Sequence, residues 1–258
     1  MIARLIALAA VCASCGHADD PVVAAPAPAV APRGPIAATT TQLVTAIVDD
    51  WTSTRATLQI WQRDTAGWRA VGASWPGVVG HSGSAWGSGL HGDGPPAGHA
   101  GPKKHEGDRK SPAGVFAIRD AYGYAPSPPT GTRLRYTPVV ASWKCVDDPA
   151  SSHYDRIVDS GATRVDWSSA EDMRRRDDLY TWVVDVAHNP ERKAGDGSCI
   201  FLHVWSGEDS STTGCTAMAE PALTRLVAAL DPARAPVYVL LPRSEYDALA
   251  PAWDLPAR

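Results

Sequence analysis

Two residues of the stretch FLHVWSGEDSSTTGC have the types and spacing that covalent chemistry requires, namely His203 and Cys215. A cysteine thiolate is a strong nucleophile, and an imidazole within hydrogen-bond reach can take the thiol proton. The polar segment 206–213 between them favours turns, so the chain can double back and bring the two side chains together. Gly214 has no side chain, so a substrate carbonyl can approach the backbone, and nearby N–H groups can stabilise an oxyanion. The pattern indicates acyl transfer through a cysteine.

A structural histidine is the alternative interpretation of the same segment. Side chains alternate along CIFLHVW, so Phe201, His203 and Trp205 are expected on one face of a strand. A lone histidine between two aromatic residues is more often a core residue bonded to a backbone carbonyl. The presence of Cys215 downstream is what favours a catalytic pair.

Three cysteines lie in the part of the chain that is expected to fold, at positions 145, 199 and 215. An odd number leaves one thiol unpaired, and an exported chain can form disulfides. The hypothesis that we take forward is a Cys145–Cys199 bridge, which leaves Cys215 free. Spacing alone does not decide the pairing, and a bridge from Cys215 to either of the others would remove the nucleophile.

The first residues, MIARLIALAAVCASC, have the composition of an export signal. A basic Arg4 is followed by an apolar run too short to span a bilayer, and small residues then lead to a cysteine. Residues 1–14 are therefore predicted to be a signal peptide, with Cys15 as the lipidated residue. Lipidation at Cys12 is one alternative, and an ordinary signal peptide without lipid is another. We expect the protein to be exported to the periplasm or cell envelope.

The rest of the chain divides into an Ala/Pro-rich linker, residues 15–41, and one domain of ordinary size, residues 42–258. With 24 basic and 28 acidic residues the formal charge is −4, and no long Lys/Arg block occurs. Nucleic acid is therefore not an expected partner. Ten tryptophans are expected mostly in the core, with stacking on sugars as the alternative.

Two polar clusters near the middle of the chain invite a functional interpretation. Four histidines lie at positions 81, 91, 99 and 105, in and just after a long glycine-rich loop, but their spacing fits no standard zinc pattern. We therefore expect no metal and no cofactor. The basic cluster at positions 103, 104, 109 and 110 either binds substrate carboxylates or forms a solvated loop.

The hydrophobic pattern predicts a mainly β fold with mixed sheets or a sandwich and a few short α-helices. Strands are expected at 57–63, 68–73, 115–119, 182–188, 199–205 and 237–241. A type I turn is expected at 111–114, and helices at 220–230 and 244–250, with 171–178 as a third, surface-exposed candidate.

The same residues resemble the signature of the L,D-transpeptidase (YkuD-like) catalytic domain family. His203 matches the family's first histidine, Thr212 its Ser/Thr, Gly214 its glycine and Cys215 its cysteine. The segments GDRKSPAGVFAI, SAWGSGLHG and CVDDPASSHYD extend the resemblance over most of residues 57–241. Thr213 replaces the family's second histidine, and the gap between His203 and Cys215 is shorter than in the usual pattern.

The resemblance implies an L,D-transpeptidase fold and a cell-wall enzyme that cross-links peptidoglycan stem peptides through a thioester. Cys215 would be the nucleophile, His203 the proton donor and acceptor, and the Gly214 backbone the oxyanion site. Thr212, Thr213 and Trp205 are the expected substrate contacts. The alternatives are an L,D-carboxypeptidase that uses the same site, or a non-catalytic peptidoglycan-binding lipoprotein. The membrane would be a partner only through the N-terminal lipid.

Overall fold

The computed structural model describes residues 34–257. The expected signal peptide, the lipidation of Cys15 and most of the linker lie outside these residues. The last linker residues, 34–41, belong to the folded part, since Ile36 and Thr40 are buried there. The Thr41 N–H also donates to the Arg234 carbonyl at 2.8 Å. The folded domain therefore begins before residue 42. Burial of the apolar Ile36 side chain holds this part of the Ala/Pro-rich segment against the domain.

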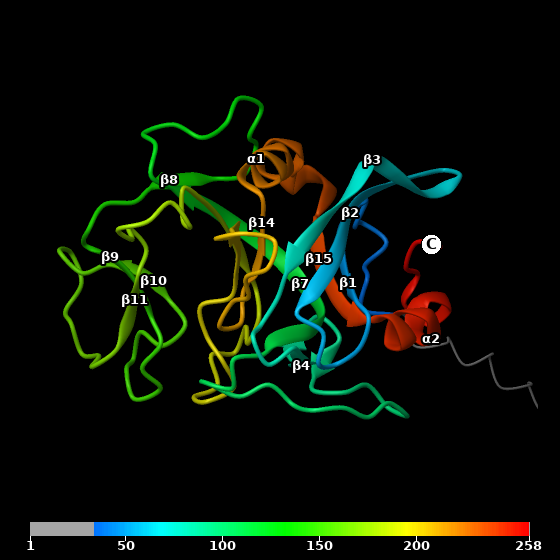
Figure 1. The fold of residues 1–258 in the computed structure, drawn as a ribbon, viewed down its shortest axis with the longest axis horizontal. Helices are drawn as coiled ribbons and strands as arrows, with labels where there is room; N and C mark the ends of the chain where they lie inside the picture. Colours follow the sequence, from blue (N-terminus) through cyan, green and yellow to red (C-terminus); the bar gives the residue numbers. More distant parts are fainter. Residues whose placement is uncertain (1–33, 258) are drawn as a thin grey trace, which may run out of the picture. The chain divides into compact units, whose positions relative to one another are not determined.

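The described chain is mainly β with mixed sheets and a few short helices, which confirms the predicted fold class (Figure 1). The strands of the largest sheet are β1 (Gln42–Val48), β2 (Arg55–Asp64), β3 (Gly67–Val78), β4 (Ser84–Trp86), β7 (Ser111–Gly123), β8 (Tyr136–Pro138), β12 (Trp182–Val186), β13 (Phe201–Val204), β14 (Thr216–Met218) and β15 (Val237–Pro242). Two small sheets pair β5 (Ser88–Gly89) with β6 (Gly92–Asp93), and β9 (Trp143–Val146) with β10 (Ile157–Asp159) and β11 (Ala170–Asp172). The helices are α1 (Glu220–Ala229), the 3-10 turn Pro232–Arg234 and α2 (Arg243–Trp253).

The large sheet closes on itself through β7. Its order runs β12-β13-β14-β3-β2-β1-β15-β7, and β7 also pairs with β12. The first half of β7 pairs with β15 from Gly114 to Ala117, and its second half pairs with β12 from Ile118 to Gly123. The long strand β7 therefore pairs with both β15 and β12, and this double pairing closes the sheet into a ring.

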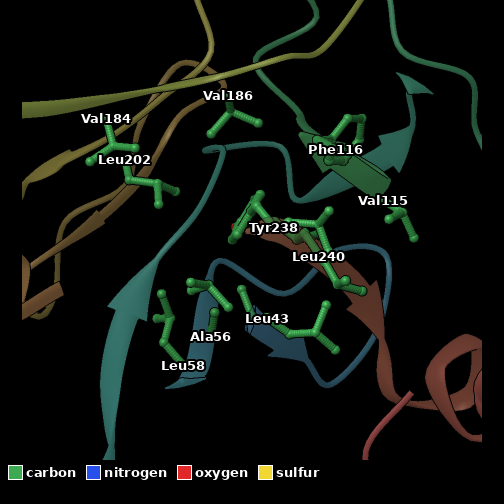
Figure 2. Close-up of a cluster of buried hydrophobic side chains, with 14 of the residues drawn as sticks. Leu43, Ala56, Leu58, Val115, Phe116, Val184, Val186, Leu202, Tyr238 and Leu240 are labelled. Carbon is green, nitrogen blue, oxygen red and sulfur yellow. The ribbon is translucent and has the colours of Figure 1, made fainter. Parts of the chain in front are cut away.

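Apolar side chains from the ring of strands fill the main core (Figure 2). Both β1 and β15 are buried along their whole length, and α2 contacts both strands. Helix α1 contacts β12 and β13 and buries Leu223 and Leu226. The predicted apolar stripe of this helix is thus the surface that it buries. Strand β13, which carries His203, and strand β14, which begins just after Cys215, both pack side chains into this core.

Two local predictions were wrong. Residues 111–114 do not form a turn, because β7 begins at Ser111 and pairs in parallel with β4 there. Pro112 is tolerated because it lies at the start of the strand, where a missing N–H costs little. Residues 171–178 are not helical, since Glu171 belongs to the short strand β11 and the following residues form bends.

No helix within residues 34–257 is both long enough and apolar enough to cross a membrane.

Candidate active site

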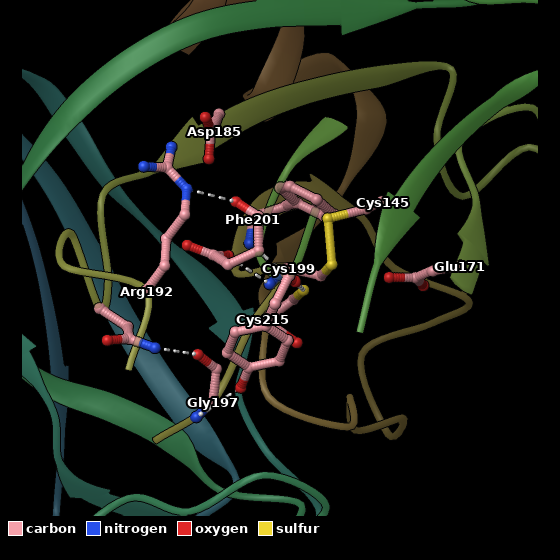
Figure 3. Close-up of a disulfide and its surroundings, with 12 residues drawn as sticks. Cys145, Glu171, Asp185, Arg192, Gly197, Cys199, Phe201 and Cys215 are labelled. Atoms are coloured by element: carbon pink, nitrogen blue, oxygen red, sulfur yellow. Dashed lines mark hydrogen bonds between the residues drawn. A yellow bond between two sulfur atoms is a disulfide. The ribbon is translucent and has the colours of Figure 1, made fainter. Parts of the chain in front are cut away.

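The structure pairs Cys145 with Cys199 in a disulfide, with 6.0 Å between the Cα atoms. Cys215 is left as a buried free thiol, the arrangement that the sequence hypothesis required. Figure 3 shows Cys215 beside Cys199, next to Phe201 at the start of β13. The three cysteines belong to one apolar cluster with Phe201 and Tyr180. The disulfide and the free thiol of Cys215 are therefore packed in the same apolar cluster.

His203 lies on β13, and Cys215 comes one residue before the neighbouring parallel strand β14, with its side chain on the same side. Strand β13 pairs with β14 so that Leu202 is opposite Thr216, which puts Cys215 at the level of Phe201. Leu202 points into the main core, whereas Phe201 packs with Cys215. Since side chains two residues apart share a face, His203 is the diagonal neighbour of Cys215, at roughly 7–8 Å between Cα atoms. Both side chains line one cavity.

A backbone carbonyl fixes the tautomer of His203. The Nδ1 atom lies 2.7 Å from the Val204 carbonyl oxygen, which can only accept a hydrogen bond. Nδ1 therefore carries the proton, and Nε2 holds the lone pair that a base requires. The ring packs edge-on against Tyr180, with 5.1 Å between the centroids. Burial lowers the pKa of His203 to about 4, with the Val204 carbonyl opposing this shift, so the imidazole is neutral near neutral pH.

The Cys215 thiol is held by the backbone of the neighbouring strand. Its sulfur accepts from the Phe201 N–H at 3.3 Å and donates to the Cys199 carbonyl at 3.4 Å. Burial and the negative charge of Glu171 raise the pKa of the thiol well above its usual range. The resting state is thus a neutral thiol beside a neutral imidazole.

The turn before Cys215 is held by the Thr212 hydroxyl. Its Oγ1 donates to the Cys215 carbonyl at 2.6 Å and accepts from the Gly214 N–H at 3.2 Å. The Ser111 hydroxyl donates to the same carbonyl at 2.8 Å. The Gly214 N–H, which we expected to face an oxyanion, is therefore occupied in the resting structure. It can reach a substrate only if Thr212 releases it.

Replacing Thr212 with valine removes both of these hydrogen bonds at nearly constant volume. We expect a loss of about 1–2 kcal/mol in unfolding free energy, because the buried Gly214 N–H loses its partner. Denaturant unfolding measures this change. Thr212→Ser keeps the hydroxyl and should behave as the wild type, and equal losses in the two variants would contradict the assigned role of the hydroxyl.

Two cavities meet at Cys215. The histidine-side cavity, of about 240 Å³, is lined by His203 together with Thr212, Thr213 and Trp205, the three residues predicted to contact substrate. The disulfide-side cavity, of about 400 Å³, is lined by Cys199 and Gly214. Four residues line both cavities, namely Cys215, Thr213, Arg109 and Glu171. Both cavities therefore reach Cys215, from two different sides.

Sequence inspection missed Glu171, Arg175 and Tyr180, which line the histidine-side cavity. The Tyr180 hydroxyl donates to Glu171 Oε1 at 2.6 Å, and Arg175 lies 3.6 Å from the same oxygen. No local motif marks these residues, because they come from β11 and the loop after it. Their only signal in the sequence was a charged segment, which we interpreted as a surface helix.

The histidine and basic clusters are dispersed in the fold. His81 lines the histidine-side cavity, whereas His91 is largely buried against Trp86 and His99 bonds Glu245 at 2.5 Å. Three members of the basic cluster are engaged elsewhere, in bonds from Lys103 to Asp93, Lys104 to Asp108 and Lys110 to the Ser82 carbonyl. Arg109 is the member whose guanidinium has no polar partner within residues 34–257, and it lines both cavities.

No family of known proteins, no curated protein and no solved structure matches the chain.

Proposed function

We propose that this protein is a cysteine-dependent L,D-transpeptidase that acts on peptidoglycan stem peptides. The observation that carries the proposal is the shared cavity of an unpaired thiol and an imidazole whose Nε2 is unprotonated. Such a pair can form and release an acyl-enzyme without a metal or cofactor. The motif resemblance supplies the substrate class. Export, with a lipid anchor on Cys15, belongs to the same proposal, because the substrate lies outside the cytoplasmic membrane.

In the first half-reaction the thiol turns from the Cys199 carbonyl toward His203. Nε2 takes the proton as sulfur attacks the carbonyl carbon between an L- and a D-centre of the stem. The tetrahedral oxyanion needs backbone donors near Gly214, which Thr212 must release. The intermediate then collapses to a thioester, and His203 returns the proton to the leaving D-alanine amine.

In the second half-reaction the amine of another stem attacks the thioester. His203 takes a proton from this amine and returns it to the departing sulfur, which restores the free thiol and leaves a cross-link. Water in place of the amine would make the enzyme an L,D-carboxypeptidase. Arg109 is suited to bind a stem carboxylate, since a guanidinium matches two carboxylate oxygens.

Exposure to a carbapenem followed by intact-protein mass spectrometry tests the proposal. We expect a single covalent adduct that peptide mapping places on Cys215, because the strained lactam carbonyl acylates an accessible nucleophile. Cys215→Ala should give no adduct, and purified stem tetrapeptides should form a thioester only with the wild type. A folded wild-type protein that gives neither product would overturn the proposed activity.

As the solution is acidified, the rate of acylation should fall only at unusually low pH. Only neutral His203 can accept the thiol proton, and its pKa of about 4 leaves it neutral down to about pH 5. The rate of carbapenem acylation should therefore not fall through the ordinary histidine pKa of 6.5 as the solution is acidified. Stopped reactions across this range measure the rate, with circular dichroism as the control for folding. An inflection near pH 6.5 would show an imidazole in contact with water.

A non-catalytic peptidoglycan-binding role is the second candidate, and the raised pKa of the Cys215 thiol favours it. In that case the cavities bind stems without acylation. Cys215→Ala distinguishes the two functions, since a binding protein would still sediment with purified sacculi and would form no thioester even before the substitution.

A further inference from the structure

A further cavity, of about 270 Å³, adjoins the disulfide at Cys145 and is lined by three arginines. Arg119 comes from β7, Arg156 precedes β10 and Arg192 follows β12, so the fold brings three distant segments of the chain together here. None of these arginines lines either of the cavities that meet at Cys215. We call this space the arginine cavity. Because like charges repel, three guanidinium groups around one cavity need negative charge close by.

Two of the three guanidinium groups have donors without partners. Arg156 forms no hydrogen bond or ion pair through its guanidinium within the described residues. Arg192 uses only its Nε, which donates to the Asp155 carbonyl at 3.3 Å, so its two terminal nitrogens have no hydrogen-bond partner among residues 34–257. Burial lowers the pKa of Arg192, and the positive charges of Arg156 and Arg119 lower it further. The three cations are therefore close enough to repel one another.

Two acids of the arginine cavity are already engaged. Asp120 pairs with Arg135. Asp185 lies 3.5 Å from Arg119, and Arg192 extends toward it as well (Figure 3). Burial also raises the pKa of Asp185 to about 6. One carboxylate is therefore shared by two guanidinium groups.

Asp155, the remaining acid of the cavity, has an oxygen without a partner. The residue is only 9% exposed, and its Oδ1 accepts from the Cys199 N–H at 3.0 Å, whereas its Oδ2 is buried and has no hydrogen-bond partner. Burial raises the pKa of Asp155 to about 7, so the carboxyl is only partly ionised near neutral pH and balances little of the positive charge. Unsatisfied buried oxygens are rare in native proteins, because each costs free energy. The cavity thus combines cations that lack an anion with an acceptor that lacks a donor.

We propose that Arg156, Arg192 and Asp155 bind the C-terminal residue of a peptide in the arginine cavity. The terminal carboxylate takes the free donors of the two arginines, because a guanidinium matches the two oxygens of a carboxylate. The backbone N–H of the same residue donates to Asp155 Oδ2, the unpartnered acceptor. A simple anion such as phosphate would satisfy only the arginines. This inference goes beyond the proposed function, since the ligand is defined without reference to the reaction at Cys215.

Titration of the isotope-labelled protein, followed by NMR, tests the ligand chemistry. The probes are N-acetyl-alanine, its methylamide, which has no carboxylate, and propionate, which has no N–H. We expect N-acetyl-alanine to shift the amide signals of Arg156, Ile157 and Arg192, propionate to bind at least about fivefold more weakly, and the methylamide not to bind. Shifts confined to Thr213 and Gly214 would place the probe in the cavities at the thiol and overturn the proposal.

Three substitutions test the assigned residues. Arg156→Gln and Arg192→Gln should each weaken N-acetyl-alanine binding by at least about tenfold. Asp155→Asn keeps an oxygen for the Cys199 N–H but puts a donor in place of Oδ2, so this variant should bind N-acetyl-alanine and propionate equally. Arg164→Gln is the matched control, because this exposed arginine does not line the cavity, and it should bind as the wild type does. Unchanged affinity in both variants of the cavity arginines would overturn the site.

Inorganic phosphate distinguishes a peptide site from a general anion site. If phosphate shifts the same signals at lower concentration than N-acetyl-alanine does, and binds Asp155→Asn as well as the wild type, the peptide assignment fails. Binding of N-acetyl-alanine by a folded protein that forms no thioester supports the arginine cavity as a site and overturns only the transpeptidase assignment. The two proposals therefore fail on different measurements.

Discussion

Replacing His203 with asparagine is expected to slow acylation of Cys215 by about 10²–10⁴-fold, the usual contribution of a positioned general base. The asparagine amide can still donate to the Val204 carbonyl, as Nδ1 does at 2.7 Å, so the strand keeps its local hydrogen bond. The substitution removes only the Nε2 lone pair. Because the resting thiol is not ionised, acylation without this base has to begin from a neutral sulfur.

Single-turnover reaction with a carbapenem, followed by mass spectrometry, gives this rate. His81→Asn is the matched control, since His81 lines the same cavity and bonds Ser211 at 3.3 Å. It should acylate at close to the wild-type rate. If His203→Asn were folded and acylated as fast as the control, the imidazole would not be the base and the catalytic pair would be refuted.

Removing the disulfide with Cys145→Ser/Cys199→Ser is expected to lower the unfolding free energy by up to about 4 kcal/mol. The bridge closes a loop with a sequence separation of 54, and the chain-entropy relation for such a loop gives this magnitude. Urea unfolding of the variant and the wild type measures the difference. The double variant leaves Cys215 as the only cysteine of residues 34–257, so thiol labelling remains interpretable.

The same variant should also react more slowly, by roughly tenfold or more, because misplaced reacting groups lose rate steeply. Cys199 has a φ of 56°, a left-handed conformation that is uncommon for a residue with a side chain. The disulfide and the Asp155 carboxylate, which accepts from the Cys199 N–H at 3.0 Å, hold it there. Its carbonyl is the acceptor for the Cys215 thiol. A variant that lost stability but acylated at the wild-type rate would show that the bridge does not position the nucleophile.

The parts of the site that follow from strand periodicity could be predicted from the sequence. Alternation placed Phe201 and His203 on one face, and the polar turn allowed Cys215 to return beside them. The partners that complete the site could not be predicted, because they depend on long-range pairing. Glu171 reaches the cavities only because β11 pairs with β9, which the disulfide at Cys145 joins to Cys199. The Val204 carbonyl that fixes the imidazole belongs to the backbone, and no residue type identifies it.

Local propensity failed where tertiary pairing prevailed. Ser-Pro-Ala-Gly has the residues of a type I turn, yet Ser111 pairs with Ser84 and its hydroxyl bonds the Cys215 carbonyl. A segment with the residues of a turn thus begins the longest strand and bonds the backbone of Cys215. The charged segment after Glu171 shows the same limit, since it forms no helix and its Arg175 pairs with Glu171 and Asp177.

The closure of the large sheet limits how a peptide can reach the thiol. Strand β13 is flanked by β12 and β14, and β14 by β13 and β3, so neither strand has an unpaired edge. A substrate backbone therefore cannot dock beside Cys215 as an additional strand, the mode that many peptide-binding proteins use. Under the proposed function, recognition of a stem peptide would depend on its terminal and side-chain groups, because its backbone cannot pair with either strand.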